Sequence, residues 1–125
     1  MEKKILQLSL ILPLLLSADV LLAGDAATGK TLYEGRGACA GCHGPTGHGD
    51  GPAAAALDPK PASFSTGAYR LDTDGDGTTG TDVDLANVIR NGAARYGGNA
   101  AMPPHPDLSD SEVADLVAYI RSLKP

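Results

Sequence analysis

The pattern of apolar residues is clearest near the C-terminus, where it repeats at the spacing of a helix. The apolar positions are Val113, Leu116, Val117, Ile120 and Leu123. They lie three or four residues apart, so a single helix face would carry all of them. The run Ser109-Asp110-Ser111-Glu112 precedes them and places an acid three residues after a hydroxyl, which is the form of a capping box. The sequence therefore predicts a final helix that begins after Ser109 and packs on the core.

A second amphipathic helix is predicted in the middle of the chain. Thr81 stands three residues before Asp84, which again has the form of a helix cap. An apolar face follows, made of Leu85, Val88 and Ile89. We expect this helix to run through Asn91 and to stop at Gly92, because glycine is favoured directly beyond a helix end.

The remaining chain predicts one further helix and long irregular segments. Residues from Thr28 to about Ala38 are expected to form a first helix that carries Leu32 and Tyr33. The stretch from Gly44 to Pro61 is rich in Gly, Pro and Ala, and only one short turn is expected there, near Ala53–Leu57. No alternating strand pattern stands out. The expected fold class is all-α, a small domain with three main helices and long loops.

The first residues have the layout of a secretory signal peptide. A short basic start precedes an apolar stretch from Ile5 to about Leu16, and small residues suited to cleavage follow. The rival interpretation is an uncleaved membrane anchor, because the apolar region approaches the length of a membrane span. Asp19 argues against the anchor, since a carboxylate in lipid is costly. We therefore expect residues 1–23 to be a signal peptide and 24–125 to be one domain in the periplasm.

A motif for covalent cofactor attachment follows the first predicted helix. Cys39-Ala40-Gly41-Cys42-His43 has the form CxxCH, the attachment motif of c-type haem. The two thiols can add to the porphyrin vinyl groups as thioethers, and His43 can then supply an imidazole nitrogen to the iron. A zinc site would need a second pair of ligands, and a dithiol redox motif would need a βαβ context. The chain has no other cysteine. The sequence predicts one haem c, bound covalently through Cys39 and Cys42.

Charge and aromatic content fit a small haem protein. The formal net charge is −5, and removal of residues 1–23 leaves it unchanged. An acidic chain is a poor candidate for binding nucleic acid and suits a basic redox partner protein. The chain has no Trp, one Phe and four Tyr. A buried porphyrin would therefore supply apolar bulk that a domain of this size lacks in its own side chains.

The second axial ligand of the iron has to come from elsewhere in the chain. Met102 is the only methionine besides the initiator, and the two prolines after it restrict the backbone. A gap-filling core role is the alternative for a methionine, but the preceding stretch is polar and rich in glycine. His105 is the main rival as a ligand, whereas His48 lies too close in sequence to His43 to reach the opposite face readily. We predict His43 and Met102 as the axial pair.

In the order of its parts the chain resembles the class I monohaem cytochromes c, particularly the bacterial periplasmic members. The residues that carry the resemblance are Gly29-x-x-Leu32-Tyr33, Cys39–Gly44, Gly49–Pro52, Asp84-Leu85, Met102-Pro103, and Leu108-Ser109 leading to Val117–Ile120. They extend over nearly the whole of residues 24–125. The resemblance implies a small helical fold around one haem, with His43 and Met102 as its axial ligands.

The same resemblance implies two contacts within the fold. The first and last helices would cross, with Gly29 allowing a close approach near Tyr119. A backbone carbonyl would accept a hydrogen bond from the other ring nitrogen of His43 and so fix the imidazole. By the resemblance this carbonyl belongs to Pro52, and Pro45 is the competing candidate.

One acidic segment departs from the simplest family pattern. Leu71–Gly77 places Asp72, Asp74 and Asp76 at alternate positions, with glycines that permit a sharp turn, as at the start of a calcium-binding loop. The full pattern requires a bidentate glutamate at its twelfth position, which here is Val83. A solvated acidic turn is therefore the commoner explanation. Calcium binding that stiffens the loop is the alternative.

These features together predict a periplasmic electron carrier that meets donor and acceptor proteins. Its iron would cycle between Fe(III) and Fe(II) while both axial ligands stay bound. A haem-relay subunit of a larger dehydrogenase or oxidase is an alternative that differs in its partner and not in its chemistry. A haem enzyme or gas sensor would need an open sixth position, which a Met102 ligand argues against. We therefore expect no catalytic activity.

Overall fold

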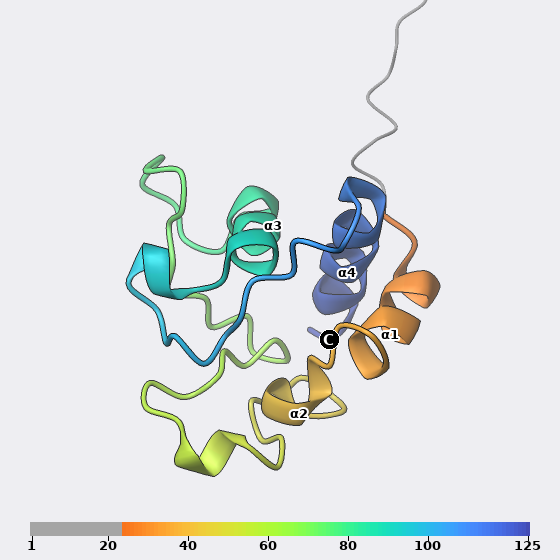
Figure 1. The fold of residues 1–125 in the computed structure, drawn as a ribbon, viewed down its shortest axis with the longest axis horizontal. Helices are drawn as coiled ribbons and strands as arrows, with labels where there is room; N and C mark the ends of the chain where they lie inside the picture. Colours follow the sequence, from red (N-terminus) through yellow and green to blue (C-terminus); the bar gives the residue numbers. More distant parts are fainter. Residues whose placement is uncertain (1–23) are drawn as a thin grey trace, which may run out of the picture.

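The computed structural model describes residues 24–125, and these fold into helices and loops without a strand. The helices are α1 (Ala26–Glu34), α2 (Ala40–His43), α3 (Asp82–Asn91) and α4 (Asp110–Ser122) (Figure 1). Two short 3₁₀ turns, η2 (Ala54–Ala56) and η3 (Ala94–Tyr96), lie in the loops. The all-α fold class is confirmed, and α1, α3 and α4 are the three helices predicted. The predicted signal peptide, residues 1–23, lies outside the described part of the chain.

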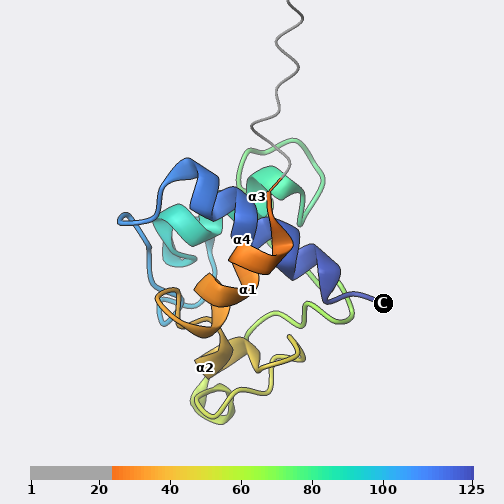
Figure 2. The ribbon, with the colours of Figure 1, turned by 90° about the vertical axis from the view of Figure 1, so that its right-hand side faces the viewer.

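The first and last of these helices pack directly on each other. Figures 1 and 2 show α1 lying against α4 from two directions. Gly29 makes this close approach possible, because a Cβ atom at this position would overlap the backbone carbonyl of Asp115. The same Cβ would lie 2.9 Å from Cβ of Tyr119. The crossing implied by the family resemblance is confirmed, together with the position of Gly29 in it.

Side-chain caps fix the starts of α3 and α4 as predicted. Thr81 Oγ1 accepts a hydrogen bond from the N–H of Asp84 at 3.2 Å, and Asp84 Oδ2 accepts from the N–H of Thr81 at 2.9 Å. Ser109 and Glu112 form the same reciprocal pair at the start of α4, with both distances at 3.1 Å. Each pair satisfies backbone donors that the first turn of a helix leaves free.

The bounds of α1 differ from the prediction at both ends. The helix begins directly after Asp25, whose carboxylate caps it, and ends at Glu34 instead of continuing to about Ala38. Gly35 and Gly37 weaken any further helix, since glycine loses more conformational freedom on folding than other residues. Ala38 has a φ of +50°, in the left-handed region, which a right-handed helix excludes. The predicted extension to Ala38 was therefore wrong.

The hydrophobic core lies where α4 meets α1 and α3. Its fully buried apolar side chains are Tyr33, Val113 and Leu116. The Tyr33 ring packs edge to face against Tyr119 and Phe64, with ring centroids 5.1 and 6.4 Å apart. Its hydroxyl donates to the backbone carbonyl of Gly44 at 2.6 Å. This bond ties the core to the residue that directly follows α2.

Two long loops complete the domain. One joins α2 to α3 and contains η2, near the short turn predicted at 53–57, and the other joins α3 to α4 and contains η3. In Figure 1 most of both loops lies on the side away from α1 and α4. Within residues 24–125, no helix is both long and apolar enough to cross a membrane.

Candidate functional site

A cavity of about 420 Å³ lies between α2, α3 and the two long loops. Its volume is in the range of about 300–1,000 Å³ that is usual for cofactor sites. The four predicted haem-binding residues, Cys39, Cys42, His43 and Met102, all line it. Much of the remaining lining is apolar, and α3 contributes Leu85, Val88 and Ile89 to it. The fold thus gathers at one cavity two parts of the chain that are far apart in sequence, and the lining suits a large apolar group.

The short helix α2 places the attachment motif on one face. The N–H groups of Cys42 and His43 donate to the carbonyl of Cys39 at 3.3 and 2.9 Å. Residues three and four apart on a helix share a face, so both sulfur atoms and the imidazole reach the same cavity. Gly44 ends the turn with a φ of +82°, a conformation that glycine adopts without strain.

The His43 ring is held from two sides. Its Nδ1 lies 3.0 Å from the backbone oxygen of Ala62, and a hydrogen bond to this carbonyl requires the proton on Nδ1. The ring of Phe64 stacks on the imidazole with centroids 4.3 Å apart and planes 19° from parallel. Nε2, on the opposite edge of the ring, is then left with its lone pair, which is the arrangement a metal ligand needs.

The backbone carbonyl that accepts from His43 Nδ1 is not one of the two that the sequence analysis gave as candidates. Pro52 and Pro45 were the candidates, and Ala62 takes the place of both. The N–H groups of Phe64 and Ser65 donate to the carbonyl of Gly47 at 2.6 and 3.1 Å, which brings the segment around Ala62 beside α2. The segment around Pro52 packs against α2 through its backbone instead. The N–H groups of Gly51 and Ala53 donate to the carbonyls of Cys42 and Gly41.

The pKa values of the motif reflect its burial. Burial lowers the pKa of His43, and the hydrogen bond to the Ala62 carbonyl offsets part of that shift. Burial also raises the pKa of the Cys39 thiol to about 11, and the nearby Cys42 adds to the increase. Neutral imidazole is the form that binds a metal. His43 is therefore available as a ligand at neutral pH.

Backbone hydrogen bonds hold Met102 at the cavity. Its N–H donates to the carbonyl of Asn99 at 3.1 Å, and its carbonyl accepts from the N–H of Ala93 at 3.2 Å. Gly92, at the end of α3, packs closely against Pro104, so a Cβ there would lie 3.1 Å from the proline nitrogen. Met102 is therefore positioned by the end of α3 and by the prolines that follow it in the sequence.

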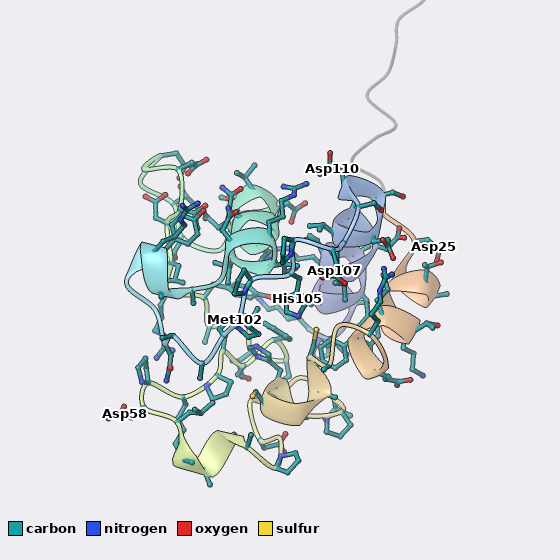
Figure 3. The ribbon with its side chains drawn as sticks, viewed as in Figure 1. Asp25, Asp58, Met102, His105, Asp107 and Asp110 are labelled. Carbon is teal, nitrogen blue, oxygen red and sulfur yellow. The ribbon has the colours of Figure 1, made fainter. Side chains whose placement is uncertain are left out.

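The two histidines considered as rival ligands lie in different places. His105 lines the cavity, and Figure 3 shows it close to Met102 in the middle of the molecule. Its Nε2 lies 3.1 Å from the backbone oxygen of Gly37. His48 is exposed and outside the cavity, and its Nδ1 lies 2.6 Å from the hydroxyl of Thr46.

Two basic side chains face the same cavity. Lys60 and Arg70 both line it, and neither pairs with a carboxylate within residues 24–125. Arg70 instead donates to the backbone oxygen of Lys60 at 2.8 Å. Lys60 Nζ donates to the backbone carbonyls of Ala54 and Ala55, both at 3.2 Å. Neither charge is neutralised by a described carboxylate. Neither residue was predicted for the cavity, because both lie in irregular segments.

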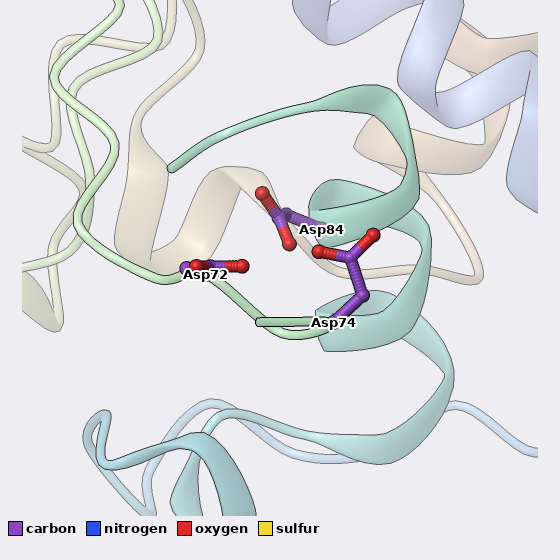
Figure 4. A group of neighbouring side chains, drawn as sticks. All are labelled: Asp72, Asp74 and Asp84. Atoms are coloured by element: carbon purple, nitrogen blue, oxygen red, sulfur yellow. The ribbon is translucent and has the colours of Figure 1, made fainter. Parts of the chain in front are cut away.

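The acidic segment gathers a different set of carboxylates from the one predicted. Asp72, Asp74 and Asp84 bring carboxylate oxygen atoms within 4.8 Å of one another, whereas Asp76 is outside this group (Figure 4). Asp84 Oδ1 accepts from the N–H and hydroxyl of Thr73 at 2.6 and 2.8 Å. These bonds clamp the loop onto the start of α3. Calcium binding stays the untested alternative to a solvated acidic turn. The hydrogen bonds from Thr73 hold the loop in place.

We expect Asp84→Asn to lower the free energy of unfolding at pH 7 by about 2 kcal/mol, because the amide keeps only one acceptor oxygen. Its NH2 group would then face the N–H of Thr73 or of Thr81, which the second carboxylate oxygen now accepts. Burial alone would raise the pKa of Asp84, but hydrogen bonds from Thr73 and Thr81 outweigh it and lower the pKa to about 2. An unfolded aspartate titrates near ~3.9. The stabilisation is therefore present above about pH 4 and is lost as the pH falls toward 2. Urea unfolding at several pH values measures it.

Asp74→Asn is the matched control for this prediction. The Asp74 carboxylate is exposed and accepts from the N–H of Asp76 at 3.4 Å, so its replacement should change stability little. A loss of stability in Asp84→Asn that is the same at pH 7 and at pH 2 would contradict the assigned role of the Asp84 carboxylate.

Comparison with known proteins gives consistent matches. Residues 26–124 match the family model described as Cytochrome c. Cytochrome c-554(547) of Halothiobacillus neapolitanus is 36% identical over 104 residues, which cover 82% of this chain and 100% of that protein. A chain of the Kuenenia stuttgartiensis reducing HAO-like protein complex matches with a TM-score of 0.64 and 33% identity. That match covers 82% of this chain and 44% of the other chain, so the present chain spans less than half the length of that relative.

Proposed function

Because this chain belongs to the cytochrome c family, as a class I c-type cytochrome, we propose that it is a periplasmic carrier of single electrons with one haem c in the cavity. Membership of the family implies covalently bound haem c and haem electron transfer. When bound, the haem supplies an iron that changes between Fe(III) and Fe(II). We assign the thioether bonds to Cys39 and Cys42 and the axial positions to His43 and Met102.

The observation that carries this proposal is that these four residues line one apolar cavity. Donation from Nδ1 of His43 to the Ala62 carbonyl holds the ring in place and makes Nε2 a stronger donor. Met102 offers a soft thioether, which favours the ferrous state and raises the potential. With two side chains bound throughout, ligation changes little between the oxidation states. Within residues 24–125 the cavity also lacks a paired acid and base for substrate chemistry, which favours a carrier over an enzyme or gas sensor.

The second candidate is a haem-relay subunit of a larger redox complex. The similarity to a chain of the Kuenenia stuttgartiensis complex favours it, since that longer chain is part of an assembly. The electron chemistry of the cavity would be the same in both cases. The periplasmic location rests on the predicted signal peptide and on the export that is typical of c-type cytochromes.

The ferric optical spectrum of the purified holoprotein tests the proposed axial pair. A weak far-red band from sulfur-to-iron charge transfer is expected if Met102 binds the iron. A high-spin spectrum, or one typical of two histidine ligands, would contradict the assignment. Native mass spectrometry of the protein from its own host then separates the two candidates, because a carrier is isolated as a single chain and a relay subunit with its complex.

Cys42→Ala is expected to weaken or abolish stable covalent attachment of haem, because one of the two thioethers can no longer form. Extraction with acidified acetone, followed by mass measurement of the intact chain, reports the fraction that keeps its haem. The Thr46→Ala variant, outside the cavity, serves as the control. Full retention of haem in Cys42→Ala would show that Cys42 is not an attachment site.

A further inference from the structure

His105 joins three separate segments of the fold. Its backbone N–H donates to the carbonyl of Ile89 at 3.0 Å, and its carbonyl accepts from the N–H of Leu108 at 3.3 Å. Its side chain reaches a different part of the chain, where Nε2 lies 3.1 Å from the oxygen of Gly37. The imidazole therefore spans from the segment that carries Met102 to the loop that enters the attachment motif, as its central position in Figure 3 illustrates.

The surroundings of the ring fix where its proton lies. The Gly37 carbonyl can only accept a hydrogen bond, so Nε2 must carry the hydrogen. Nδ1 is buried and has no hydrogen-bond partner within residues 24–125. Burial of an unsatisfied polar atom is unfavourable, and an aliphatic side chain would fill the same space without it. The bond from Nε2 to Gly37 is therefore the feature that an imidazole adds at this position.

The Gly37 carbonyl is also close to the first cysteine of the motif. Cys39 Sγ lies 3.5 Å from the same oxygen. Under the proposed function this sulfur becomes a thioether and no longer carries a hydrogen. Among the described side chains, His105 then remains as the donor to this carbonyl. The bond from His105 is thus the side-chain contact that survives haem attachment.

The loop that this bond holds is a strained one. Ala38 lies between Gly37 and Cys39 and has a φ of +50°, which is unfavourable for a residue with a Cβ. The N–H of Gly37 donates to the carbonyl of Leu32 in α1 at 2.8 Å, and the N–H of Ala38 donates to the carbonyl of Gly35 at 2.9 Å. The orientation of the Gly37 peptide therefore decides how the chain enters Cys39, and His105 holds the carbonyl of that peptide.

We propose that His105 is a positioning residue that links the Met102 segment to the thioether side of the cavity. By bonding Gly37, it sets how closely the methionine sulfur approaches the iron and how readily an external ligand can displace it. This inference rests on the proposed function, because it requires Met102 as an axial ligand.

The test compares His105→Leu with His105→Gln in the purified ferric holoprotein. Leucine removes the donor, whereas the terminal amide of glutamine offers an N–H at a similar reach to Nε2. Imidazole titration measures how easily Met102 is displaced, with the far-red band as the signal. We expect His105→Leu to bind imidazole about tenfold more tightly, as the loss of one hydrogen bond corresponds to roughly one decade in affinity. His105→Gln is expected to recover most of the difference.

Two controls separate this role from general stabilisation. His48→Leu removes an exposed histidine outside the cavity and should titrate like the unsubstituted protein. All titrations are made at a temperature well below the thermal unfolding midpoint of each variant. A change in overall stability alone then leaves the imidazole affinity unchanged. If His105→Leu yields no holoprotein, His105→Asn takes its place, because its amide is too short to reach Gly37.

Each outcome decides the proposal. Unchanged imidazole affinity in His105→Leu, or equal changes in the Leu and Gln variants, would overturn the positioning role while leaving Met102 as the ligand. Absence of the far-red band from the unsubstituted protein would overturn the proposed axial pair itself. A spectrum typical of two histidines that becomes high-spin in His105→Leu would make His105 the ligand and overturn both.

Discussion

Met102→Ala should leave the haem attached but lower the reduction potential, by on the order of 0.2 V, since axial ligands set haem potentials over a range of about 0.8 V. The substitution removes the soft thioether that favours Fe(II). It also leaves the sixth position open, so cyanide or imidazole should bind at much lower concentrations. Potentiometric titration and ligand titration of the ferric protein measure the two effects.

Met102→His is the matched variant for this experiment. An imidazole at residue 102 would keep the iron six-coordinate but would not stabilise Fe(II) as a thioether does. We therefore expect it to lower the potential while excluding external ligands. If Met102→Ala changes neither the potential nor the ligand affinity, Met102 is not the axial ligand and the proposed carrier chemistry needs another one.

Gly29→Ala is expected to destabilise the fold by about 3 kcal/mol, at the upper end of the usual cost of overpacking. The added Cβ would overlap the backbone carbonyl of Asp115. Backbone cannot move aside as a flexible side chain can, so α1 would have to shift away from α4. Denaturant unfolding should give a lower midpoint with an unchanged slope, which reports a loss of stability without a change in the surface exposed.

Gly41→Ala provides the matched glycine control. A Cβ at Gly41 meets no atom within 4 Å, and the residue lies inside α2. Alanine is favoured over glycine in a helix interior by roughly 0.5–1 kcal/mol, so this variant should be no less stable than the unsubstituted protein. Equal stabilities of Gly29→Ala and Gly41→Ala would mean that the two helices do not depend on the close approach.

Local patterns in the sequence were enough to predict most of the helices. The capping pairs at Thr81 and Ser109 act within four residues, and the apolar spacing that follows each is a property of a single helix. The CxxCH motif is equally local, so its three residues could be named before any fold was known. Even the Gly29 contact was accessible, through the family resemblance.

The features that were missed depend on tertiary structure. The acceptor for His43 is a backbone carbonyl, which every residue has, so nothing in the side chain of Ala62 distinguishes it. Asp84 joins the acidic group in place of Asp76 because the start of α3 folds back onto the loop. The bond between His105 and Gly37 joins positions 68 residues apart, beyond the reach of any local pattern.

The packing of α1 on α4 also constrains the order in which the chain can fold. α1 is among the first parts of the domain to be synthesised and α4 is the last, so their contact forms only when nearly the whole chain is present. Closing a loop between distant parts of a sequence costs entropy before the contact is made, which slows folding. During that interval α1, which leads into the segment that carries Cys39 and Cys42, is not yet packed against α4. The topology therefore leaves the helix that precedes the attachment motif without its packing partner until the final helix has been synthesised.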